Sequence, residues 1–329
     1  MASSDVTSPW IASAPWLEPV RGGHPTSAMM GLSGIEQLAA LRDGTIPQPP
    51  LSRLTGMRLE EFGDGNATFT MPLTGWLTDP SGIIPIGPLV IPTDAAMACA
   101  LMTRLPANSP FTTSQLVLAQ LRPVSQGATV SARATVVEAG EKALMAEVSL
   151  FDDADGLVAR GSSLCVILPA TAQGAREPDR PATAAADSSD NGRQASLDPW
   201  QRRPPDDGLR ALTGLVEISE EPGVVKFALP ASPWFAAPPP GRVQGGMVAL
   251  LADAAISRVI RAAGPEHSTF APLELKLNFL RPLASDGGQA QACARLVQAG
   301  RRIAVAGAEV LDARGRTIAI ASGSAIRVS

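Results

Sequence analysis

Two aspartates stand inside apolar runs and are the strongest candidates for chemistry. Asp94 lies in the run IGPLVIPTDAAMA at 86–98, and Asp253 lies in GRVQGGMVALLADAAIS at 241–257. An ionised carboxylate among Ala, Leu and Met side chains is costly unless it has a partner or a function. In each run a glycine precedes the aspartate by seven residues, and the two runs are 159 residues apart. We interpret them as the central helices of two fused copies of one fold.

Other short motifs recur at nearly the same spacing. Their offsets stay between 158 and 160 residues, and a spacing kept over so long a stretch indicates a tandem duplication. The recurring motifs are Leu-Thr-Gly at 54–56 and 212–214, Leu-Arg-Pro at 121–123 and 280–282, and Ala-Gly at 139–140 and 299–300.

The domain organisation follows from this repeat and from composition. Residues 31–169 and 209–329 are the two predicted domains, residues 1–30 an N-terminal arm, and residues 170–208 a flexible linker that is too polar to bury a core. In the first domain, 33–41 is predicted to be a helix capped by Ser33. Alternating apolar residues between turn motifs predict strands at 54–71 (two strands around the turn at 63–65), 112–121, 128–138, 144–151 and 157–168.

Composition excludes several classes of protein. The net charge of -4 over 329 residues argues against nucleic-acid binding. No apolar run is long enough to span a membrane, and we expect no signal peptide. The three cysteines have neither metal-site nor disulfide spacing, so we expect no metal and a cytoplasmic location.

The order and spacing of these motifs resemble the PaaI-type branch of the hotdog-fold acyl-CoA thioesterases, over 34–168 and 209–328. The resemblance implies an α+β fold: two hotdog domains fused in tandem, each a long helix wrapped by a curved antiparallel sheet, paired within one chain. It also implies hydrolysis of an acyl thioester at sites between the domains, with the CoA moiety as part of the substrate and no other cofactor.

In this family a glycine N–H at the start of the helix polarises the thioester carbonyl, and an acid on the partner helix acts as base or nucleophile. A Ser or Thr about one strand later holds the water. Carried over to this chain, the resemblance pairs Gln244, Gly245 and Gly246 with Asp94 and Thr112. We call this arrangement site one.

Site two pairs Pro85, Ile86 and Gly87 with Asp253 and Ala271. It has lost one glycine, the donor side chain and the hydroxyl, whereas glutamine can still donate a hydrogen bond at site one. The sequence therefore favours one working and one degenerate site, with Asp253 as relic or spare.

Several alternatives stay open at this level. Asp94 could be a first-turn acid that complements its own helix dipole, and Pro92 should bend the helix or delay its start. If neither site works, the protein would bind acyl thioesters without hydrolysing them. A hotdog dehydratase is disfavoured because His24 and His267 fit no motif.

Four arginines are candidates for the nucleotide phosphates of CoA, for which arginine is suited. They could equally be solvated turn residues. They are Arg122, Arg281, Arg301 and Arg302. The sequence leaves open the acyl group, the carrier (CoA or acyl-carrier protein) and whether two chains form a homodimer.

Overall fold

The computed structural model describes residues 14–169, 197–238, 240–265 and 269–328. The first half contains η1 (Pro15–Leu17), α1 (Ser27–Met30), α2 (Gly34–Arg42), α3 (Pro50–Thr55), β1 (Arg58–Gly63), β2 (Asn66–Pro72), η2 (Gly75–Leu77), α4 (Ile86–Met102), β3 (Phe111–Gln120), β4 (Thr129–Ala139), β5 (Ala143–Phe151) and β6 (Leu157–Ile167). The second half contains η4 (Pro199–Gln201), α5 (Gly208–Thr213), β7 (Val216–Glu221), β8 (Val224–Pro230), η5 (Pro233–Phe235), α6 (Gly245–Ala263), β9 (Phe270–Phe279), β10 (Gln289–Ala299), β11 (Ile303–Leu311) and β12 (Thr317–Arg327).

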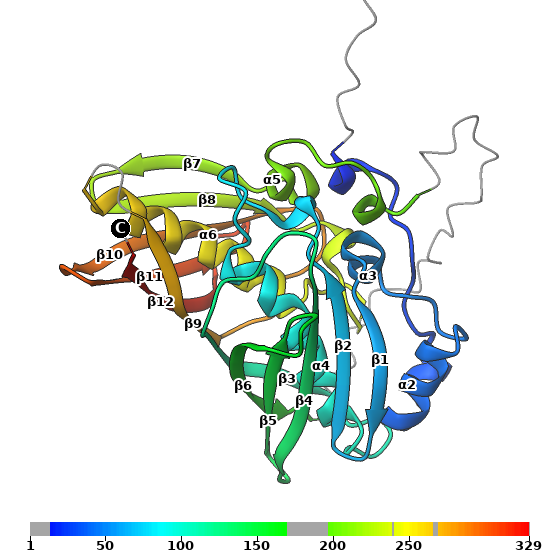
Figure 1. Ribbon diagram of the computed structural model, residues 1–329. Coiled ribbons are helices and arrows are strands. Elements are labelled where there is room, and N and C mark those ends of the chain that lie inside the picture. Colours follow the sequence, from blue (N-terminus) through cyan, green and yellow to red (C-terminus); the bar gives the residue numbers. More distant parts are fainter. Residues whose placement is uncertain (1–13, 170–196, 239, 266–268, 329) are drawn as a thin grey trace, which may run out of the picture.

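Within the described residues, twelve strands form one sheet in the order β1-β2-β4-β5-β6-β3-β9-β12-β11-β10-β8-β7. Counted from either edge, corresponding strands of the two halves follow in the same order, from β1 to β3 and from β7 to β9. The two halves are therefore copies that meet at an antiparallel β3–β9 junction. The sheet curves around the two long helices, α4 and α6 (Figure 1). The predicted tandem hotdog architecture is therefore confirmed.

Most of the predicted elements of the first half are confirmed to within one residue. Ser33 and Glu36 form a full capping box at the start of α2, and β3 to β6 follow the predicted strands. One boundary was wrong: the first strand does not begin at Leu54, which belongs to α3. Pro50 stands in the first turn of α3, and Gly56, with φ of 79°, ends it in the left-handed conformation.

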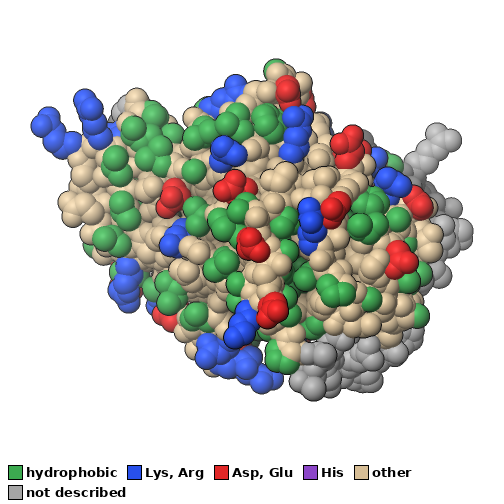
Figure 2. All heavy atoms as spheres, turned by 90° about the horizontal axis from the view of Figure 1, so that it is seen from below, with side chains coloured by type: hydrophobic (Ala, Val, Ile, Leu, Met, Phe, Trp, Pro, Cys, Tyr) green, Lys and Arg blue, Asp and Glu red, His purple; other side chains and the backbone are tan. Residues whose placement is uncertain are grey.

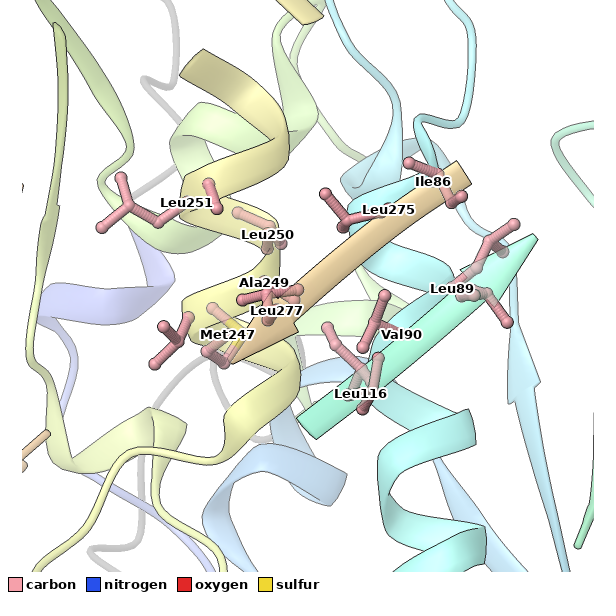
Figure 3. Close-up of a cluster of buried hydrophobic side chains, with 14 of the residues drawn as sticks. Ile86, Leu89, Val90, Leu116, Met247, Ala249, Leu250, Leu251, Leu275 and Leu277 are labelled. Carbon is pink, nitrogen blue, oxygen red and sulfur yellow. The ribbon is translucent and has the colours of Figure 1, made fainter. Parts of the chain in front are cut away.

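The two central helices cross in close contact. A Cβ atom at Gly87 would lie 2.8 Å from Leu250 Cα, and one at Gly246 would lie 2.7 Å from Ile91 Cα. Only glycine fits such an approach of backbone to backbone. The crossing is enclosed by apolar side chains of both helices and of β3 and β9, including Val90 (Figure 3).

Pro92 lies inside α4 and does not delay its start. The helix begins at Ile86 and continues to Met102. The Thr93 hydroxyl donates hydrogen bonds to the carbonyls of Leu89 and Val90, at 3.1 and 3.0 Å. The helix continues past Pro92, which has no N–H to donate to the Pro88 carbonyl one turn earlier.

Two Pro-Trp segments bind the halves together. Trp16 of η1 lies against Gly214 in the second half, and Trp200 of η4 lies against Gly56 in the first. Each segment thus packs on the half that it does not immediately precede.

The ends of these segments are also held by buried tryptophans. The Trp76 indole donates to the Arg202 carbonyl at 2.8 Å, and the Trp234 indole donates to the Glu18 carbonyl at 2.9 Å. Glu18 and Arg202 form an ion pair that joins the two segments. The rest of the predicted arm and linker, 1–13 and 170–196, lies outside the described residues, and the predicted domain boundaries stay a prediction.

The helix crossing gives a first prediction. We expect Gly87→Ala and Gly246→Ala each to lower the free energy of unfolding by about 1–3 kcal/mol, because the added methyl forces the helices apart. The measurement is urea unfolding. Gly307→Ala is the matched control, since the nearest atom to its added Cβ is 3.6 Å away. Crossing variants as stable as the control would contradict the account.

Candidate functional site

The N-terminus of each central helix faces the aspartate of the other helix. The Gly246 N–H donates to Asp94 Oδ2 at 3.2 Å, and the Gly87 N–H donates to Asp253 Oδ2 at 2.9 Å. These are the partners that the sequence analysis assigned to sites one and two. Both contacts join the two halves of the chain, so neither exists within a single domain.

Both carboxyl groups are buried, with Asp94 6% exposed and Asp253 3% exposed. Burial raises the pKa of Asp94 to about 6, against the hydrogen bonds from Gly246 and Gly245. Burial also raises the pKa of Asp253, against its hydrogen bonds from Gly87 and Ser257. The positive end of the opposite helix stabilises each anion. A carboxylate of this kind can accept a proton near neutral pH.

Asp94 does not complement the dipole of its own helix. The first turn of α4 contains no acid, and Asp94 stands in the third turn, as Asp253 does in α6. The alternative interpretation as a first-turn acid is therefore wrong. The helix N-terminus that Asp94 contacts is that of α6.

The sequence differences at site two do not remove its hydrogen-bond donor. Pro85 is the N-cap of α4 and Gln244 is the N-cap of α6, and the donating N–H belongs to the second helical residue in both cases. Gly87 therefore supplies the same group as Gly246. The argument that site two is degenerate at its helix N-terminus loses its basis.

The Gln244 side chain is used within the protein. Its Nε2 donates to the Ile91 carbonyl at 3.0 Å. Its Oε1 is buried and has no hydrogen-bond partner among the described residues. The amide therefore ties the loop before α6 to α4.

The structure links Thr113, rather than the predicted Thr112, to the Cys165 thiol near Asp94. Thr112 pairs with Val166 in the sheet, and a bulge follows between Thr113 and Gln115. Thr112 makes no side-chain hydrogen bond to a described residue, whereas the Thr113 Oγ accepts from the Cys165 thiol at 3.7 Å. The sequence carries no signal for this bulge. The supporting role of Thr112 stays a prediction.

Two thiols share the surroundings of Asp94. Burial and the nearby Asp94 carboxyl raise the pKa of Cys99 to about 12 and also raise that of Cys165. Both thiols are therefore neutral at physiological pH. Cys99 follows Asp94 by five residues in α4, whereas nothing in the sequence indicated that Cys165 would lie near the aspartate.

The surroundings of Asp253 are more polar than those of Asp94. The Ser257 hydroxyl donates to Asp253 Oδ1 at 2.8 Å, and the charge of Arg261 helps to stabilise the carboxylate. A cavity of about 60 Å³ reaches Asp253 and is lined by both halves, including Pro85, Phe227 and Ser257. Ser257 was missed as a site residue, although a position four residues on shares the helix face.

The four arginines do not form one cluster. Arg122 pairs with Asp152 at 2.8 Å, and Arg281 donates to the Thr317 carbonyl at 2.7 Å. Because β3 and β9 run antiparallel, these two residues follow opposite ends of the junction. Arg301 and Arg302 are exposed at the β10–β11 turn. On the face shown in Figure 2, basic side chains are interspersed with acidic and hydrophobic ones.

Both aspartates lie in segments that match a known protein family. The model of the thioesterase superfamily matches residues 93–159 and 240–319, and the matched segments contain Asp94, Gly246 and Asp253. Each half of the chain therefore contains a segment similar to the thioesterase superfamily. A comparison with curated proteins gives no match.

Solved structures show that the chain has the fold of double-hotdog proteins. A TesB protein of Mycobacterium avium subsp. paratuberculosis is 15% identical with a TM-score of 0.56, and the match covers 85% of this chain and 98% of that one. The acyl-CoA thioesterase II TesB2 of Mycobacterium marinum is 11% identical with a TM-score of 0.55, over 84% of this chain and 97% of that one. Among the described residues, no helix is long and apolar enough to cross a membrane.

The raised pKa of Asp94 predicts a specific pH dependence of stability. Its ordinary pKa is 3.8 and its pKa in the folded protein is about 6, so the folded state holds the proton more tightly. Its contribution to stability is complete below about pH 4 and is lost as pH rises through 6. Asp94→Asn abolishes this titration. The stability of Asp94→Asn relative to wild type should therefore rise by about 2 kcal/mol between pH 4 and pH 7.

Urea unfolding of both proteins at pH 4, 5, 6 and 7 measures this difference. Groups that the substitution does not affect titrate equally in both proteins, so their contributions cancel in the difference between the two free energies of unfolding. A difference between the two proteins that does not change with pH would show that Asp94 has an ordinary pKa.

Proposed function

We propose that this protein hydrolyses an acyl thioester where the N-terminus of one central helix meets the aspartate of the other. The observation that supports this most directly is the pair of contacts from Gly87 to Asp253 and from Gly246 to Asp94. Each contact places an N–H donor at a helix N-terminus beside a buried carboxylate. Hydrolysis needs these two groups together, because one stabilises the oxyanion and the other activates water.

The reaction follows from these two groups. The thioester carbonyl oxygen accepts a hydrogen bond from the glycine N–H. In the free protein this N–H donates to the aspartate carboxylate. The carboxylate takes a proton from a water molecule as the water oxygen bonds to the carbonyl carbon. The resulting oxyanion is stabilised by the N–H and by the helix dipole. When the C–S bond breaks, the thiolate leaves with the proton that the carboxyl group had taken.

Finer parts of the proposal concern the substrate and its setting. We propose CoA as the thiol carrier, with the exposed Arg301 and Arg302 available to its phosphates. Membership of the PaaI-type branch is part of the same proposal. Because Cys99, Cys165 and Cys293 are all free thiols, we also propose a reducing compartment such as the cytoplasm.

The test is release of free thiol from a panel of acyl-CoA esters, from acetyl to palmitoyl and including aryl esters. We expect the double variant Asp94→Asn/Asp253→Asn to lose at least about 100-fold in kcat/KM, since general-base catalysis contributes about that much or more. Asparagine keeps the shape of the side chain but cannot take the proton from water.

Thermal unfolding shows whether the double variant is folded, and Gly307→Ala is a control substitution away from both carboxylates. Full activity in the folded double variant would refute the proposed base. Acyl-CoA binding by calorimetry without thiol release from any ester would instead identify a non-catalytic acyl-thioester binding protein.

The same assay predicts the pH profile. The carboxylate must be ionised to accept the proton, so kcat/KM should rise with pH and level off above the pKa of the aspartate, which burial raises in both cases. A rate that is constant from pH 4.5 to 8 would contradict a carboxylate base with a raised pKa.

A further inference from the structure

The two carboxylates have the same contact with the opposite helix, but their surroundings differ. Resting on the proposed function, we infer that the substrate enters and reacts at Asp253, that Ser257 is a positioning residue for this carboxylate, and that the substrate is a short-chain acyl thioester. Asp94 is then the counterpart that does not react. This reverses the preference for Asp94 that the sequence suggested.

The first observation is access. The cavity at Asp253 is bounded by Pro80 and Pro85 of the first half and by residues of α5, β8 and α6 of the second. A substrate in it would therefore contact both halves, and its carbonyl would lie near the start of α4. That position is beside the Gly87 N–H, which donates to Asp253.

The second observation is the cover over the other helix. Met102 in α4 is the counterpart of Arg261 in α6, which lines the cavity. Helix α2 packs on Met102 so closely that a side chain at Gly34 would collide with the Met102 carbonyl. In the second half, the described residues 197–207 contain no counterpart of α2. Helix α2 thus covers the end of α4 at Met102, whereas Arg261 at the corresponding position of α6 lines the cavity.

The third observation is the chemistry around each carboxylate. Ser257 donates to Asp253 Oδ1 while Gly87 donates to Oδ2, so both oxygens are fixed. The position four residues after Asp94 is Ala98, which has no donor. A carboxylate held at two points keeps one orientation toward the cavity, which favours proton transfer from a water in a fixed place.

The fourth observation is size. Ligand pockets for drug-sized molecules have volumes of about 300–1,000 Å³, whereas this cavity has about 60 Å³. Leu209, Leu215 and Phe227 form its apolar wall, and Phe227 is 4% exposed. The space suits an acyl group of a few carbon atoms, on the order of acetyl to butyryl.

The decisive experiment compares Asp253→Asn with Asp94→Asn in the thiol-release assay with acetyl-, propionyl- and butyryl-CoA. We expect Asp253→Asn to lower kcat/KM at least about 100-fold. Asp94→Asn should lower it less than about tenfold. Activity that survives in Asp253→Asn but is lost in Asp94→Asn overturns this inference and leaves the proposed function standing. A wild-type protein that cleaves no thioester overturns both.

Ser257 is tested separately. Ser257→Ala should lower kcat about tenfold with little change in KM, and should move the pH profile to higher pH, because the lost hydrogen bond stabilises the ionised carboxylate. Ser257→Thr keeps the hydroxyl and should restore both. An unchanged pH profile in a folded Ser257→Ala would refute the positioning role.

The small volume of the cavity can be tested through acyl-chain preference, without using the aspartate variants. Phe227→Ala enlarges the cavity and should shift the preference toward octanoyl-CoA at least about tenfold. Phe69→Ala removes the counterpart side chain, equally buried at 4% exposed, and should leave the preference unchanged. The same shift in both variants, or in neither, would contradict the assignment of the acyl pocket to this cavity.

Discussion

The close crossing of α4 and α6 is the constraint on which the rest of the structure depends. Gly87 and Gly246 allow the two backbones to approach, and this approach brings each helix N-terminus within hydrogen-bond distance of the aspartate on the other helix. Without it, Asp94 would lose its hydrogen-bond donors in an apolar interior, and Asp253 would keep only Ser257 and the charge of Arg261. The crossing thus permits the buried charges and also makes both sites shared between the halves.

The tandem arrangement lets the two sites diverge within one polypeptide. A homodimer of single hotdogs would have two identical sites by symmetry. Here α2 packs at the end of α4, and Ser257 has an alanine as its counterpart. The exchanged Pro-Trp segments hold the halves in register through Trp16 and Trp200, so unequal sites can persist in one fixed frame.

Much of this could be predicted from the sequence, because the duplication and the strand patterns are periodic and local. The pairing of Gly246 with Asp94 came from a family resemblance and not from periodicity. What could not be predicted depends on packing: the bulge that presents Thr113, the thiols beside Asp94, and the cover that α2 provides. The presence of isoleucine instead of glycine at position 86 suggested a degenerate site two. The donor there is the backbone N–H of the next residue, Gly87, which is retained.

The most direct measurement of the central claim is a crystal structure with a non-hydrolysable short-chain acyl-CoA analogue in which a methylene group replaces the thioester sulfur. The account predicts one analogue per chain, with its carbonyl oxygen accepting the Gly87 N–H beside Asp253 and its acyl group against Phe227. A carbonyl at the Gly246 N–H beside Asp94 would contradict the choice of site. An analogue bound away from both helix N-termini would contradict the account as a whole.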